Sequence, residues 1–211
     1  MHNHVRRLVD AAEPGRLDRL EYKSATILGA NLAHHDIEHL TRPGRIGVSR
    51  AFELVILADG SAMPLSAERR ALSLSKIREF SEVIRKHGGQ VALYMTHAYV
   101  APHRRAKSDN ARLTETHYVD AGNKVNALVI PVGLAFEEAY SRRPEIRLHM
   151  NFDGTHPDLA GTYLAACVVY GAVYAKPCLG NPYNYFGKIS KEDAAFLQKV
   201  ADDTLHSFYG R

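Results

Sequence analysis

The amino-acid sequence predicts an α/β fold built on a parallel β-sheet. Short apolar runs of strand length recur along the chain, amphipathic stretches of helical periodicity lie between them, and Gly or Pro residues separate the two kinds of segment. Parallel strands need crossover connections, so this alternation indicates a parallel sheet. The 211 residues can bury a substantial core and show no internal repeat or linker. We therefore expect a single domain spanning residues 1–211.

Four runs rich in apolar, β-branched or aromatic residues have the length of strands. They are residues 20–28, 52–57, 90–95 and 127–132. The longest amphipathic stretch has its apolar residues on one helical face and ends at a Gly-Gly pair, which is a common way for a helix to stop. The expected helices are 3–12, 33–40, 66–86, 110–123, 134–141, 159–174 and 190–208.

Composition argues against several classes of function. The formal net charge is only +4, and the arginine pairs are scattered rather than gathered in the basic stripe that nucleic-acid binding requires. Cys167 and Cys178 are too few for a disulfide framework or a zinc motif. No apolar stretch reaches about 18 residues, and the N-terminus lacks the apolar core of a signal peptide. We expect a cytoplasmic protein that binds neither nucleic acid nor membrane.

Ligands of open parallel sheets bind outside the carboxyl ends of the strands. Three loops qualify by this rule: residues 58–65, 96–105 and 151–157. The first carries Asp59 and Ser61, and the second carries His97. Ser61 lacks the Gly-x-Ser-x-Gly surroundings that expose a nucleophile in α/β-hydrolases. For the loop that carries His97, a solvated loop without a functional role is an equal interpretation.

The third loop holds the most informative pattern. Asp153 and His156 lie three residues apart, directly before a helix of small residues. A carboxylate that orients an imidazole is the arrangement of a general base, and one short loop can supply both groups. The alternative is an N-cap Asp followed by an ordinary loop histidine, because both residue types are common before helices.

A second pattern suggests a metal. His35 and His39 are four residues apart, which would place two imidazoles on one face of a helix. The motif is not His-Glu-x-x-His, because Asp36 takes the second position, and no third ligand follows at a recognisable distance. A polar helix face explains the pair more simply, and we expect no metal cofactor.

The chain resembles the SGNH hydrolases, the GDSL-type esterase and lipase superfamily. The similarity is clearest in residues 153–166, where Asp-Gly-Thr-His-Pro and a Gly-containing helix resemble the final block of that family. Residues 22–31 are similar to the second block, a strand that ends at a Gly, and residues 52–61 to the third strand and its loop. The similarity extends from about residue 5 to 208. It implies the flavodoxin-like three-layer α/β/α fold of these enzymes.

The resemblance also assigns roles. It makes His156 the general base, Asp153 its orienting carboxylate, and Gly29 a backbone donor of the oxyanion hole, with Asn31, Asp59, Ser61 and His97 as possible residues of the cleft. The implied substrates are small or carbohydrate-linked acyl or acetyl esters, with no cofactor.

Two departures from the family pattern bear on activity. The nucleophilic Ser of the family follows a first strand, whereas this sequence begins in what resembles the first helix, with no such strand or Ser before His4. Where the family offers an amide side chain after the third strand, this chain has Ala58 and Asp59. Losing one oxyanion donor typically costs a factor of about 10² to 10³. These departures predict a chain shortened at its N-terminus and lacking its first strand.

Three functions remain open at this point. The first is ester hydrolysis by the SGNH route, weak or absent without the Ser nucleophile. The second is a degenerate domain that binds a ligand or partner without turnover. The third is a metal-dependent hydrolase that uses His35 and His39. Loss of a central strand would expose strand edges, so we also expect a homo-oligomer that pairs through those edges.

Overall fold

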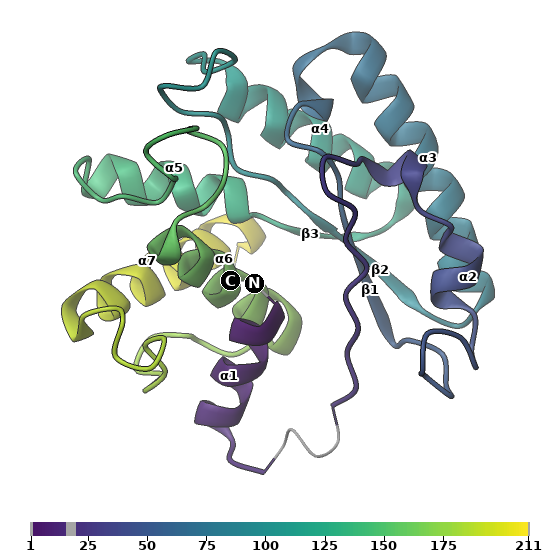
Figure 1. The fold of residues 1–211 in the computed structure, drawn as a ribbon, viewed down its shortest axis with the longest axis horizontal. Helices are drawn as coiled ribbons and strands as arrows, with labels where there is room; N and C mark the ends of the chain where they lie inside the picture. The colour runs from purple at the N-terminus through teal and green to yellow at the C-terminus, as the bar shows by residue number, and fades with distance from the viewer. Residues whose placement is uncertain (1, 16–19, 211) are drawn as a thin grey trace. The chain divides into compact units, whose positions relative to one another are not determined.

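The computed structural model describes residues 2–15 and 20–210 (Figure 1). Contacts divide the chain into two compact units. The first unit combines residues 1–20, 97–108 and 131–211, and the second combines residues 21–96 and 109–130. The whole is a mixed α/β protein, as the sequence predicted, with seven α-helices and a parallel sheet among the described residues.

The second unit is built on three strands, β1 (Leu54–Ala58), β2 (Gln90–Tyr94) and β3 (Leu128–Ile130), in the order β1-β2-β3. All pairs are parallel, which confirms the sequence prediction. The central strand β2 is the most buried, because Val91, Ala92 and Leu93 have at most 4% of their surface exposed. Near-continuous burial is usual for a parallel strand with neighbours on both sides.

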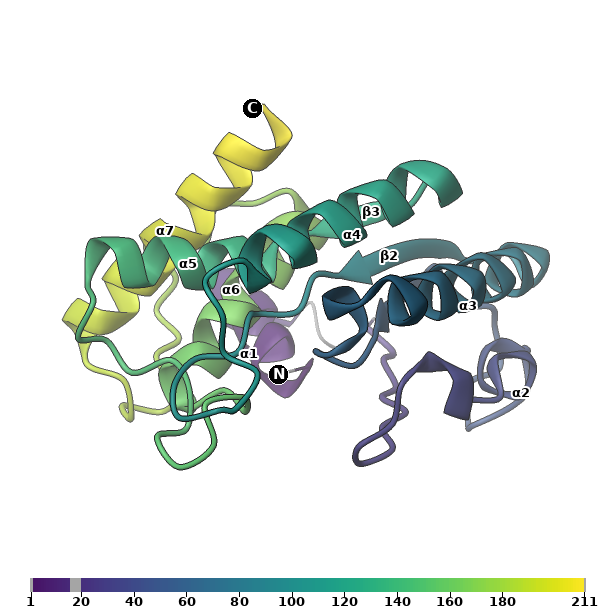
Figure 2. The ribbon, with the colours of Figure 1, turned by 90° about the horizontal axis from the view of Figure 1, so that it is seen from above.

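Helices α3 (Ala67–Lys86) and α4 (Asn110–Val125) pack against this sheet and each other (Figure 2). The Ser66 hydroxyl caps α3 by accepting from the N–H of Arg69. Gly122 of α4 lies so close to the sheet that a Cβ there would be 2.3 Å from Cγ2 of Val129, so only glycine allows this approach.

Two elements of this unit differ from prediction. Residues 20–28, predicted as a strand, join no ladder, and Leu28 is 95% exposed. The predicted helix 33–40 is instead the 3-10 turn η2 (Leu32–His34) and the short helix α2 (Ile37–Thr41). The break has a local cause: the Asp36 carboxylate accepts from the N–H of His39 and so caps a new helix.

The first unit is helical, with α1 (His2–Ala12), α5 (Val132–Arg142), α6 (Leu159–Tyr174) and α7 (Lys191–Tyr209). Helix α6 is its centre, since it packs against α1, α5 and α7. Eleven residues of α6 are buried, including Cys167, which is a free thiol like Cys178. Helix α6 spans the predicted residues, and the other three match their predictions within two residues.

No helix of the described residues is both long and apolar enough to cross a lipid bilayer.

Candidate active site

Two of the three predicted loops, residues 96–105 and 151–157, contact each other within the first unit. Of the loop 96–105, the part from His97 onward belongs to this unit. The N–H of Val100 donates to the carbonyl of Gly154 at 3.0 Å. Gly154 has a left-handed φ of +62°, and a Cβ there would lie 2.1 Å from the carbonyl oxygen of Val100. Glycine is therefore required for both backbone conformation and space. The remaining predicted loop, residues 58–65, belongs to the other unit.

A short antiparallel bracket holds the base of the 151–157 loop. His149 and Pro157 form an isolated bridge, the N–H of Met150 donates to the carbonyl of His156, and the N–H of Asp158 donates to the carbonyl of Leu148, both at 2.8 Å. These bonds fix both sides of the loop immediately before α6.

Asp153 is the acceptor at the centre of this loop. Its Oδ1 accepts from the N–H groups of Thr155 at 2.8 Å and His156 at 3.0 Å, and its Oδ2 accepts from Nδ1 of His156 at 2.7 Å. The Thr155 N–H, followed by the His156 ring and N–H, lowers the pKa of Asp153 to about 2. Asp158, rather than Asp153, caps α6. The N-cap explanation of Asp153 is therefore wrong.

The geometry fixes how the His156 ring is protonated. An ionised carboxylate only accepts hydrogen bonds, so Nδ1 of His156 carries the proton that faces Asp153. In the neutral ring, the lone pair is then on Nε2. The His156 side chain is 68% exposed, whereas that of Asp153 is 20% exposed. The Asp153 carboxylate thus holds the ring at Nδ1, and the exposed neutral ring offers Nε2 as the proton acceptor. This is the arrangement of a general base.

Beneath this loop are two buried histidines. His97 is 8% exposed, its ring stacks on Phe136 at 4.6 Å between centroids, and its Nε2–H donates to the carbonyl of Thr155 at 2.7 Å. His149 is 3% exposed; its Nε2–H donates to the carbonyl of Ala98 and its Nδ1 accepts from the Tyr140 hydroxyl. Burial lowers the pKa of both imidazoles, that of His149 to about 4.

In the second unit, Asp59 follows β1, and both of its carboxylate oxygens already accept hydrogen bonds within the protein. Its Oδ1 accepts from the N–H groups of Leu32 at 3.1 Å and Gly60 at 2.8 Å, and its Oδ2 accepts from the Ser73 hydroxyl at 2.6 Å. Ser73 in turn accepts from Nε2 of His117 at 3.0 Å. Asp59 is 7% exposed. Its hydrogen bonds connect the backbone at Leu32 to Ser73 of helix α3.

The other predicted residues of this unit lie near the same end of β1. Asn31 caps η2 by accepting from the N–H of Ala33, and Gly29 is in an exposed turn with φ of +70°. Ser61 lies half-buried in the turn before the 3-10 segment η3 (Met63–Leu65). The Gly29 conformation is one that favours glycine, and its surroundings are open, since a Cβ there would meet no atom within 4 Å.

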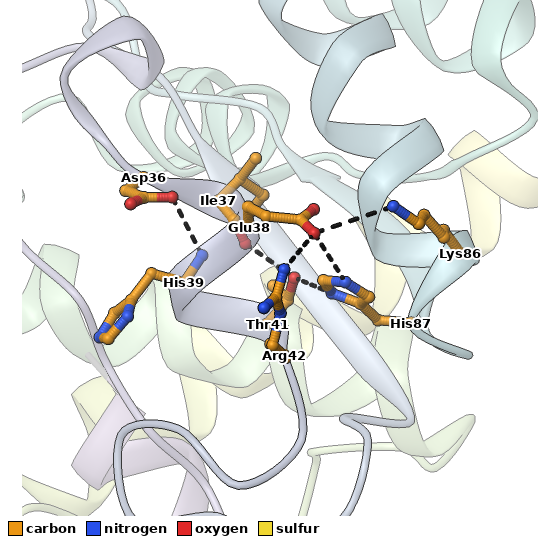
Figure 3. Close-up of polar contacts among 8 residues, drawn as sticks. All are labelled: Asp36, Ile37, Glu38, His39, Thr41, Arg42, Lys86 and His87. Atoms are coloured by element: carbon orange, nitrogen blue, oxygen red, sulfur yellow. Dashed lines mark hydrogen bonds and ion pairs between the residues drawn. The ribbon is translucent and has the colours of Figure 1, made fainter.

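The arrangement that the metal-dependent alternative requires is not formed. His35 lies before α2 and His39 within it, so the two do not share a helix face. Figure 3 shows His39 pointing away from the neighbouring ionic cluster, in which Glu38 contacts Arg42 at 2.8 Å and His87 at 3.4 Å. Across residues 2–15 and 20–210, no three His, Cys, Asp or Glu side chains are grouped to hold a metal ion.

Sequence reasoning missed His149 and the pair Ser73–His117. His149 had a signal: it follows Leu148 and precedes Met150 in a short alternation that leads into the 151–157 loop. Ser73 also had one, since it shares a helical face with the buried Ile77 and Phe80. A polar residue on an apolar face indicates an internal hydrogen bond.

Comparison with known proteins supports the fold. No model of a protein family matches the sequence, and no curated protein matches it either. A DUF4886 family protein from Bacteroides uniformis superposes with a TM-score of 0.64 at 20% identity, covering 72% of this chain and 62% of that one. A candidate SGNH hydrolase from Slackia heliotrinireducens superposes with a TM-score of 0.55 at 24% identity, covering 69% and 80% respectively.

These likenesses confirm an SGNH/GDSL-like α/β fold for this chain, as the sequence resemblance implied. The match spans less than two thirds of the Bacteroides protein. At such identities the similarity concerns the fold alone.

Proposed function

We propose that the Asp153–His156 pair is the general base of an ester hydrolase of the SGNH type. The hydrogen bond of 2.7 Å from Nδ1 of His156 to Oδ2 of Asp153 carries this proposal. It leaves Nε2 as the proton acceptor on an exposed ring held by a carboxylate of depressed pKa. The hydrolase-like fold supports the same conclusion. We assign no cofactor to the reaction.

In the proposed reaction, His156 accepts a proton at Nε2 from the hydroxyl or water that attacks the ester carbonyl. Asp153 holds the ring and stabilises the imidazolium that forms. The proton passes next to the leaving alcohol, which restores the neutral ring. General-base assistance of this kind typically contributes a factor of about 10² to 10⁴. The substrates we propose are acyl or acetyl esters, including those on carbohydrate.

Hydrolysis of p-nitrophenyl acetate by the full chain tests the proposal, with buffer and His156→Ala as references. We expect slow turnover above buffer that falls at least about tenfold in His156→Ala while staying measurable above buffer. Equal rates for wild type and His156→Ala, or a wild-type rate no higher than buffer, would exclude the proposed base. Ser61→Ala serves as a matched hydroxyl variant: a parallel loss would identify Ser61 as the nucleophile, and an unchanged rate would leave the attack to water or another hydroxyl.

A second function, ligand binding without turnover, is favoured by one observation. Among the described residues, the side-chain hydrogen bond of His156 goes to Asp153 and none goes to a hydroxyl. A base without a bound nucleophile can still accept a hydrogen bond from a sugar hydroxyl. Calorimetric titration with an acetylated sugar distinguishes the two functions: saturable binding with an intact ester supports binding alone, and release of acetate supports the hydrolase.

The association of two copies also stays a proposal. In the described sheet, β1 pairs only with β2, so its second edge carries no ladder, and Ile27 and Leu28 are exposed. Open strand edges and exposed apolar residues each favour association with another chain. Sedimentation of the wild type against Leu28→Lys tests this idea, since the proposal requires a dimer that the lysine weakens. A monomeric wild type across the concentration range would contradict it.

A further inference from the structure

We propose that His97 is a positioning residue for the Asp153–His156 pair, acting through the peptide group that joins Thr155 to His156. This inference rests on the function proposed above. The sequence suggested His97 as a residue of the cleft, but its ring is buried and lies flat against Phe136, with an angle of 11° between the ring planes.

The decisive geometry is that one peptide group is held at both ends. Its carbonyl, that of Thr155, accepts from Nε2–H of His97 at 2.7 Å. Its N–H, that of His156, donates to Oδ1 of Asp153 at 3.0 Å. A rotation of this peptide away from His97 would therefore also weaken a bond to the carboxylate that holds the His156 ring. Hydrogen bonds linked through one amide also polarise one another.

The environment of His97 keeps its ring in the form that this role needs. A carbonyl can only accept, so Nε2 must carry the proton. The other nitrogen, Nδ1, is buried and has no hydrogen-bond partner within the described part of the chain. A second proton on the ring would place a charge there without a partner, beside the ring of His149 at 4.8 Å between centroids. His97 is therefore a neutral, fixed donor.

A second buried histidine, His149, holds the backbone next to His97. His149 donates from Nε2 to the carbonyl of Ala98 at 3.1 Å, and the Tyr140 hydroxyl donates to its Nδ1 at 2.7 Å. Ala98 directly follows His97, so this bond fixes the backbone from which the His97 ring extends. Both nitrogens of His149 are satisfied, unlike Nδ1 of His97. Among the described residues, the His97 ring is therefore hydrogen-bonded through Nε2 and not through Nδ1.

Two substitutions separate the donor from the ring. His97→Phe keeps an aromatic ring against Phe136 and removes the donor, and it also removes the unpaired Nδ1. His97→Gln keeps an N–H donor of similar reach and loses the ring. His103→Phe is the matched control, because His103 is in the same segment and stacks on Tyr99 at 4.0 Å, while its Nδ1 accepts from the N–H of Arg105.

The test is the titration of the Asp153 carboxyl, followed by ¹³C NMR on the full chain. With the donor removed, we expect its pKa to rise by roughly half a unit to one unit, since hydrogen bonds to a carboxylate hold its pKa down. His97→Gln should restore most of the wild-type value, and His103→Phe should leave it unchanged. A lower thermal midpoint in His97→Phe with an unchanged Asp153 pKa would reduce His97 to a structural role and overturn the inference.

The titration needs no turnover, so the two proposals fail separately. A shifted Asp153 pKa in a chain without esterase activity would retain the positioning role and reject the proposed function. His156-dependent turnover with an Asp153 pKa insensitive to His97 would do the reverse. If both hold, His97→Phe should lower kcat more than it raises KM, because a misplaced base affects the chemical step.

Discussion

The loop 153–157 and the segment 22–29 were each predicted to carry part of one site, yet they are built very differently. The loop is fixed by the bracket to Leu148 and Met150, by Val100, and by the Asp153 carboxylate. The segment 22–29 joins no ladder and is mostly exposed. The comparison shows that the Asp153–His156 pair is assembled by its own unit, whereas Gly29, the predicted oxyanion donor, has no comparable framework around it.

The two glycines of these regions offer the largest expected difference. Both have positive φ, +62° at Gly154 and +70° at Gly29, so alanine at either costs about 1 to 2 kcal/mol of backbone strain. At Gly154 the added Cβ would also meet the Val100 carbonyl oxygen at 2.1 Å, and overpacking adds roughly 1 to 3 kcal/mol. Urea denaturation should show Gly154→Ala to be much the less stable variant. Equal losses would mean that the loop yields as easily as the open segment.

A smaller effect is expected from pH, through His149. Burial lowers its pKa from 6.5 to about 4, so the unfolded chain binds the proton first as the pH falls. His149 therefore lowers the free energy of unfolding progressively between about pH 6.5 and pH 4. His149→Gln can keep both hydrogen bonds without titrating. As the pH falls from 6.5 to about 4, the free energy of unfolding of His149→Gln should therefore rise relative to that of wild type. If the two proteins lose stability in parallel over this range, His149 is not buried in its neutral form.

Asp153 should act in the same direction but in a more acidic range. Its folded pKa is depressed from 3.8 to about 2, so its stabilising contribution is complete above about pH 4 and disappears as the pH falls toward 2. In Asp153→Asn this part of the pH dependence should be missing. Thermal midpoints from pH 5 to pH 2 measure it. A wild-type curve that coincides in shape with that of the asparagine variant would indicate that the carboxylate is not held as described.

The smallest effect is expected in the exposed segment. Leu28 is 95% exposed, so Leu28→Ser in the monomer should change the free energy of unfolding by less than about 0.5 kcal/mol. Denaturation at low protein concentration measures the change. A large loss from Leu28→Ser would show that residues 22–29 are packed in solution.

The sequence predicted those elements whose signal is local. Helix α6 agrees with its predicted bounds, 159–174, because a long apolar run follows an N-cap Asp. The strand predicted for residues 20–28 is absent, because β-branched and aromatic residues form a strand only where a neighbouring strand pairs with them. The pairing partner is a tertiary matter that the pattern of residues does not contain.

The same limit applies to the site. The bond between Asp153 and His156 spans three residues, so the sequence could place both groups in one loop. The contact from His97 to Thr155 spans 58 residues, and that from His149 to Ala98 spans 51. Histidines far apart in sequence carry no signal of which carbonyl they will meet. Their roles became visible only from the folded chain.

The most direct test of the account is a double-mutant cycle on p-nitrophenyl acetate hydrolysis with Asp153→Asn and His156→Ala. If Asp153 works through His156, the asparagine variant should lose at least about tenfold in rate, and the double variant should be no slower than His156→Ala alone. Such non-additivity is the result that we predict. Losses that add in the double variant, or an Asp153→Asn rate equal to that of wild type, would contradict the claim that the two residues form one general base.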